Sequence, residues 1–126
     1  HTLYNPHSGD YLQTRNEQEY NSLIGIGWVS SNKKINIETE ATDETKPINR
    51  CYNHDIGRHI TTASPCPADF VFESVQGHIY KNNEGDAKVP VYLCKHVENQ
   101  SWKNVSTMEE CQADGFVLDG VMGYVK

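Results

Sequence analysis

The chain has 126 residues, with 17 acidic and 11 basic side chains and a formal net charge of −6, which is the size of a single domain. This acidity argues against a nucleic-acid-binding protein, because such a protein needs Lys and Arg to displace phosphate counterions. No apolar run approaches the roughly 20 residues that span a bilayer, so membrane insertion is not expected. A charged and apolar leader does not occur in these residues, and a signal peptide would therefore have to precede them.

Turn-forming residues are spread along the whole chain. Gly, Asn, Ser, Thr and Pro recur every few positions, and β-branched and aromatic residues fill the intervals between them. This pattern is typical of many short strands joined by turns rather than of long helices. We therefore expect an all-β protein.

Three segments of the chain are similar to one another when the sequence is aligned with itself. Each segment begins with three residues that align with those of the other two, and a turn follows. The ends of the segments are also similar, most clearly at residues 70–77 and 116–123. The aligned starts are residues 3–5, 51–53 and 94–96, and the aligned turn residues are Gly9, Gly57 and Gln100. We interpret these as three diverged repeats of about 42 to 48 residues within one domain. The single domain 1–126 thus divides into repeats 1–46, 47–89 and 90–126.

Each repeat is expected to contain about four strands. The first strand opens the repeat, and the second follows the turn, at residues 11–14, 59–62 and 102–105. A further pair is expected around Trp28, at 70–79 and at 116–125. Three such units would close into a β-trefoil-like barrel, which leaves few strand edges exposed. A three-bladed propeller is disfavoured because blades usually number four or more.

The four cysteines can pair in three ways, and the alignment of the repeats chooses among them. Cys51 and Cys94 occupy the same column, while Cys66 and Cys111 both stand shortly before the Phe that opens the closing segment. The predicted disulfides are therefore Cys51–Cys66 and Cys94–Cys111. Such bonds imply an oxidising compartment, and so a secreted or cell-surface protein.

Two further expectations concern the cysteine positions. In the first repeat Leu3 takes the place of the first cysteine, and an apolar contact with Tyr20 or Leu23 is expected to replace the bond. The alternative use of the four cysteines is a zinc site, although no Cys-x-x-Cys and no close Cys–His spacing occurs. The six histidines likewise show no ligand pattern. We expect neither a metal nor another cofactor.

The first repeat carries the clearest motif, Leu-Tyr-Asn-Pro-His-Ser-Gly-Asp-Tyr-Leu-Gln-Thr from Leu3 to Thr14, followed by Gly27-Trp28. It resembles a bacterial repeat family of unassigned function, whose members read Leu-Tyr-Asn-Pro-x-x-Gly-Asp-His-Phe-Tyr-Thr and then Gly-Trp. The resemblance weakens along the chain, and in the third repeat Gln100-Ser101 replaces Gly-Asp. Such repeats are attached to secreted hydrolases and surface proteins. The resemblance thus implies an accessory, lectin-like binding module without catalytic residues.

A ring follows the turn in every repeat, at Tyr11, His59 and Trp102. The residues that follow two of these rings, Leu12 and Ile60, are expected to face inward. Because side chains alternate along a strand, the rings themselves would then point outward. An exposed flat ring suits the apolar face of a sugar. The alternative is that the rings pack over the hairpins and close the end of the barrel. The polar neighbours expected to bind sugar hydroxyls are Asp10, Arg58 and Asn104.

Two more columns are expected to be structural. Asn5, Asn53 and His96 precede the turns, where such side chains usually bond their own backbone. The large rings that open the closing segments should belong to the core, as such rings usually do. These rings are Trp28, Phe70 and Phe116.

We expect a non-catalytic glycan-binding or adhesion module of a larger secreted protein or hydrolase. Its partner would be a glycan or polysaccharide on a cell surface or in an extracellular matrix, including a host glycoprotein. An enzyme is not expected, because no Gly-x-Ser-x-Gly motif or other catalytic constellation is visible. The alternative is a protein-binding module, such as a protease inhibitor or a host-protein adhesin. Its anchor would lie in loop 31–47 or loop 81–88.

Overall fold

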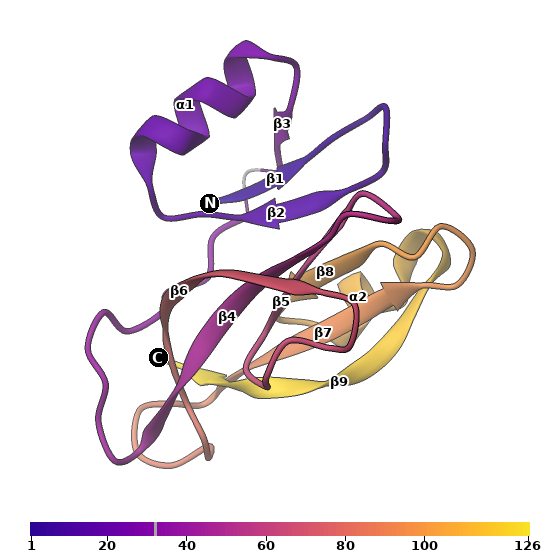
Figure 1. The fold of residues 1–126 in the computed structure, drawn as a ribbon. Coiled ribbons are helices and arrows are strands. Elements are labelled where there is room, and N and C mark those ends of the chain that lie inside the picture. Colours follow the sequence, from indigo (N-terminus) through magenta and orange to yellow (C-terminus); the bar gives the residue numbers. More distant parts are fainter. Residues whose placement is uncertain (32) are drawn as a thin grey trace.

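The computed structural model describes residues 1–31 and 33–126, and most of their regular structure is β-strand, as expected. Figure 1 shows the three repeats in chain order. The first repeat contains β1 (Thr2–Tyr4), β2 (Tyr11–Gln13), α1 (Glu17–Gly25) and β3 (Val29–Ser30). The second contains β4 (Thr45–Asn53), β5 (Arg58–Thr62) and β6 (Val71–Tyr80). The third contains β7 (Val89–His96), β8 (Trp102–Val105), α2 (Met108–Cys111), the 3-10 turn η1 (Ala113–Gly115) and β9 (Phe116–Val125).

The same strand order occurs in all three repeats. The first strand of each lies between the second and the third, which gives the antiparallel orders β2-β1-β3, β5-β4-β6 and β8-β7-β9. Pairing of Tyr80 with Tyr124 joins the second and third sets into one six-stranded sheet. The first set forms a separate sheet, drawn in indigo and violet beside the others in Figure 1.

The expectation of four strands per repeat is wrong, since each repeat has three among the described residues. The predicted closing pair is a single long strand in β6 and in β9, and each bends at two bulges. The bulged residues, left out of the pairing with β4 and β7, are Glu73 and Gln76 in β6 and Asp119 and Met122 in β9. An extra residue bends a strand without ending it. This strand count leaves the β-trefoil arrangement unconfirmed.

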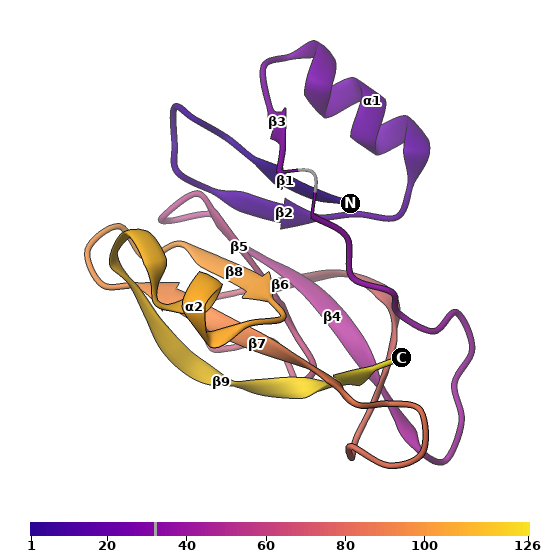
Figure 2. The ribbon, with the colours of Figure 1, turned by 180° about the vertical axis from the view of Figure 1, so that it is seen from behind.

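The three hairpin turns lie on the same side of the molecule (Figures 1 and 2). Each turn contains a residue in the left-handed backbone region: φ is 80° at Gly9, 66° at Gly57 and 58° at Gln100. The first and third turns also touch, because the Ser101 hydroxyl donates to the Gly9 carbonyl at 2.5 Å. The second strands β2, β5 and β8 consequently face each other at the centre of the fold.

The column that precedes the turns bonds its own backbone, so this prediction is confirmed. The Asn5 side-chain oxygen accepts from the amides of residues 7 and 8 at 2.9 and 3.1 Å, and that of Asn53 accepts from residue 55 at 2.9 Å. In the third repeat, Nδ1 of His96 takes the same role toward residues 98 and 99. A ring nitrogen therefore replaces an amide oxygen as the acceptor of this turn.

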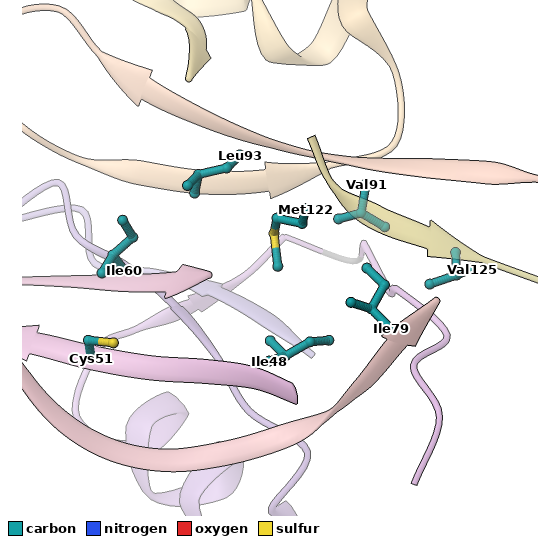
Figure 3. Packing of buried hydrophobic residues seen from close by; sticks show 8 residues of the cluster. All are labelled: Ile48, Cys51, Ile60, Ile79, Val91, Leu93, Met122 and Val125. Atoms are coloured by element: carbon teal, nitrogen blue, oxygen red, sulfur yellow. The ribbon is translucent and has the colours of Figure 1, made fainter. Parts of the chain in front are cut away.

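The main core lies between the second and third repeats. Figure 3 shows its eight buried side chains, which converge from β4, β5, β6, β7 and β9. Of the rings expected in the core, Phe116 is buried, Phe70 is half-buried against the core, and Trp28 is half-buried. The eight residues are Ile48, Cys51, Ile60, Ile79, Val91, Leu93, Met122 and Val125.

Both predicted disulfides are confirmed, Cys51–Cys66 and Cys94–Cys111. Because they use all four cysteines, the zinc alternative is wrong. Leu3, at the equivalent position of the first repeat, is fully buried. Its expected contact with Tyr20 or Leu23 stays a prediction.

Candidate functional site

The predicted rings lie at the junctions between repeats and are half-buried. Tyr11 of the first repeat stands edge-on to Phe116 of the third, with ring centroids 5.8 Å apart. Trp102 of the third repeat stands edge-on to Phe70 of the second at 5.5 Å. The expectation of outward, open ring faces is therefore wrong. Its reason is that β2, β5 and β8 face one another across the centre instead of facing solvent.

The polar neighbours of these rings bind groups of the protein itself. Asp10 is 3% exposed and accepts from the His59 amide at 2.8 Å. Asn104 is 7% exposed, and its Nδ2 donates to the carbonyl of Thr61 at 2.9 Å. Nε of Arg58 donates to a carbonyl of the third hairpin turn at 3.2 Å. These contacts join the repeats, and a role of the six predicted residues in ligand binding stays a prediction.

A network of charged side chains, which the sequence did not reveal, lies between the first and second repeats. Arg50 is at its centre, with a side chain that is only 10% exposed. Its two terminal nitrogens donate to the two carboxylate oxygens of Glu19 at 2.7 and 2.9 Å, and its Nε donates to Glu73 at 2.9 Å. The bond with Arg50 lowers the pKa of Glu19, although burial of the carboxyl opposes the shift. Arg50 thus ties α1 of the first repeat to β4 and β6 of the second.

His59 extends this network. Its Nδ1 lies 2.7 Å from Asp10 and its Nε2 lies 3.2 Å from Glu73. The contact with Asp10 is a hydrogen bond, whereas the contact with Glu73 is a close approach of the two side chains. The hydrogen bonds between His59 and Asp10 therefore attach the second repeat to the first.

A surface cleft of about 290 Å³ opens beside the Arg50–Glu19 pair. It lies between the first repeat, from the end of β2 to the start of α1, and strands β4 and β6 of the second. Seven of its eight lining side chains are polar, and they offer both hydrogen-bond donors and acceptors. The lining residues are Thr14, Arg15, Asn16, Glu19, Arg50, Ser74, Val75 and Gln76.

A smaller cavity of about 80 Å³ adjoins the cleft and shares Thr14, Arg15 and Gln76 with it. Its walls are largely apolar and include four residues labelled in Figure 3: Ile48, Ile79, Val91 and Met122. The three second strands contribute equivalent polar residues to it, namely Gln13, Thr61 and Asn104. We call it the axial cavity, because these residues surround the centre where the three strands meet. These polar residues could have been noticed in the sequence, because each follows a predicted ring by two residues.

Within residues 1–31 and 33–126, no group of three or more His, Cys, Asp or Glu side chains could hold a metal ion. Neither helix in this part of the chain has the length and apolar character that a membrane crossing requires.

A family model covers the whole chain, residues 1–126, and describes a domain of unknown function, DUF5648. The chain belongs to this family. No curated protein matches it, and no solved structure does. The description of the DUF5648 family states no activity.

The DUF5648 domain also exposes apolar side chains at equivalent positions of its repeats. The residue after the ring of each closing segment is Val29, Val71 or Val117, and these are 51%, 53% and 47% exposed. Further along the closing strands of the second and third repeats, two more equivalent pairs are exposed. These pairs are Phe72 with Leu118 and Val75 with Val121.

Proposed function

We propose that this DUF5648 domain is a non-catalytic, lectin-like glycan-binding module of a larger secreted or cell-surface protein, with a β-trefoil-like threefold arrangement of its repeats. The observation that carries the proposal is the polar cleft between the first two repeats. A sugar hydroxyl both donates and accepts, so a sugar site needs donors and acceptors side by side. The exposed guanidinium group of Arg15 supplies donors, Glu19 supplies acceptors, and Asn16 and Gln76 supply both.

The charges and contacts of the cleft favour a neutral sugar. Arg50 is already neutralised by Glu19 and Glu73, which leaves little net charge to attract an acidic ligand. The two parallel hydrogen bonds between Arg50 and Glu19 also hold one wall of the cleft in a fixed geometry, and a preformed site loses less entropy on binding. Val75 adds an apolar surface for the C–H face of a sugar ring.

The proposed setting is extracellular. Two disulfides are typical of secreted or surface proteins, and the proposed partner is a polysaccharide or glycoprotein on a cell surface or in a matrix. Binding by a single shallow cleft should be weak, about micromolar to millimolar, so several copies would be needed for tight attachment.

A glycan array with the purified, oxidised domain tests this function. Arg15→Ala should abolish the hits, because Arg15 is an exposed donor of the cleft. Lys34→Ala is the matched control, since it removes the same charge from an exposed residue outside the cleft, and it should bind like the wild type. Loss of binding with Trp102→Ala but not with Arg15→Ala would show that the glycan binds at the predicted rings instead of in the cleft. A blank array with folded protein would reject glycan binding.

The repeated apolar positions favour a second candidate function, binding of a protein. Exposed apolar patches often mark protein interaction sites, and two closing strands of this domain expose apolar side chains at equivalent places. In that case Phe72→Ser should abolish capture of an extracellular protein or inhibition of a protease, while Arg15→Ala should not. If Arg15→Ala abolishes this activity and Phe72→Ser does not, the protein partner binds in the cleft.

A further inference from the structure

We infer that the glycan bound in the cleft carries N-acetyl groups, as polymers of N-acetylhexosamine do, and that the axial cavity receives one acetyl group. This inference rests on the proposed function and adds the class of sugar to it. It begins from the position of the two spaces. Thr14, Arg15 and Gln76 line both, so an apolar cavity lies directly beside the polar cleft.

The size of the axial cavity limits what can enter it. Its volume is about 80 Å³. An apolar cavity of about 150 Å³ binds benzene, so a cavity of about half that volume admits a group of about three heavy atoms. An acetyl group has a methyl carbon, a carbonyl carbon and an oxygen. A whole sugar ring is far too large, so only a substituent of the ring fits.

The chemistry of the walls matches an acetyl group at both of its ends. Ile48, Ile79 and Val91 provide an apolar surface suited to a methyl group (Figure 3). Gln13 provides the polar counterpart. Its Oε1 accepts from the Thr2 hydroxyl at 2.8 Å, whereas its Nε2 is buried without a partner among the described residues. A buried donor of this kind is costly, and a carbonyl oxygen would satisfy it.

A pair of ligands that differ only at the relevant group tests the inference. Chitin oligosaccharides and cello-oligosaccharides have the same ring and the same linkage, but the first carry an acetamido group where the second carry a hydroxyl. Burial of one methyl and one hydrogen bond predict about tenfold tighter binding of the chitin oligosaccharide, measured by titration calorimetry or by NMR. Lengthening the N-acyl chain from acetyl to propionyl should weaken binding again, because the cavity is full.

Two conservative substitutions locate the acetyl group in the protein. Val91→Ile narrows the axial cavity and should remove most of the preference for the chitin oligosaccharide. Val125→Ile makes the same change in the same core cluster but outside the cavity lining, and it should keep the preference. Gln13→Leu removes the unpartnered donor at similar volume and should reduce the preference without affecting the cello-oligosaccharide. Thermal unfolding verifies that each variant is folded.

The outcomes separate this inference from the proposed function. Equal affinity for the two oligosaccharides would overturn the inference and leave glycan binding standing. A preference for chitin oligosaccharides that survives Val91→Ile and Gln13→Leu would also overturn it, because the acetyl group would then lie elsewhere. Binding of no oligosaccharide at all by the folded wild type would overturn both.

Discussion

The first repeat and the other two share a strand order but are fastened by different interactions. The second and third each contain a disulfide and a long closing strand, and both belong to one six-stranded sheet. The first has Leu3 in place of the first cysteine, a closing strand β3 of only two residues, and a sheet of its own. Its attachment includes the Arg50–Glu19 and Asp10–His59 contacts.

This comparison separates two roles of the residues. Positions that recur in every repeat, such as the left-handed turn position of Gly9, Gly57 and Gln100, determine the local chain path and hence the common strand order. Those that do not recur, such as Arg50 and Glu19, determine how one repeat is attached to the next. A repeated pattern therefore predicts topology better than it predicts interfaces.

The largest expected effect comes from removing the disulfide of the third repeat. Cys94 and Cys111 are separated by 17 positions in the sequence. Replacing both by Ala opens the loop that the disulfide closes and should lower the free energy of unfolding by about 3 kcal/mol. Urea denaturation of the oxidised wild type and the double variant measures the difference. A loss below about 1 kcal/mol would mean that the strand pairing of β7 and β9 already holds the third repeat without the bond.

The next largest effect comes from removing the ion pairs of Arg50, which attach the first repeat. Arg50→Ala leaves Glu19 and Glu73 without their shared partner and should cost about 2 to 3 kcal/mol. Hydrogen exchange should increase most in β1, β2 and α1, because these elements belong to the repeat that Arg50 attaches. Arg58→Ala is the control, since among the described residues Arg58 donates only to backbone carbonyls, and this change should cost less than about 1 kcal/mol. An equal rise in exchange across all three repeats would contradict this assignment.

A smaller effect is expected where the second and third repeats touch. A Cβ added to Gly123 would lie 2.5 Å from the carbonyl oxygen of Tyr80, a backbone atom that cannot move aside. Gly123→Ala should therefore destabilise the fold by about 2 kcal/mol. Gly120→Ala in the same strand is the control, because nothing lies within 4 Å of its added Cβ. Equal melting temperatures for the two variants would show that β6 and β9 separate without cost.

The smallest effect is a pH dependence at the first repeat. The bond with Arg50 lowers the pKa of Glu19 from its ordinary value of 4.5, so this carboxylate stabilises the fold above pH 4.5. The contribution is lost as the pH falls below that value toward the lowered pKa. Glu19→Gln should lower the melting temperature at pH 7 and reduce its fall between pH 5 and 3, whereas Glu40→Gln, at an exposed position, should match the wild type. Parallel melting curves for both variants across this range would contradict the assignment.

Much of the local structure could be predicted from the sequence. The pairing of Cys51 with Cys66 followed from its equivalence to Cys94 with Cys111, because similar segments adopt similar paths. The helix α1 was not predicted, although Asn16 carried a signal: its side chain accepts from the Glu19 amide at 3.0 Å, and acidic residues fill the first turn. That signal was short, and the strand-like composition around it outweighed it.

The sequence by itself determined the β-rich class, the hairpin turns and the disulfides, since each depends on residues close together in the chain or on direct repetition. Tertiary structure alone decided that Tyr11 and Trp102 pack between repeats, that Arg50 meets Glu19 across 31 residues, and that the polar cleft adjoins the axial cavity. Strand alternation gives the side of a strand on which a residue lies, but not what covers that side. The packing of three repeats around one centre supplied that information here.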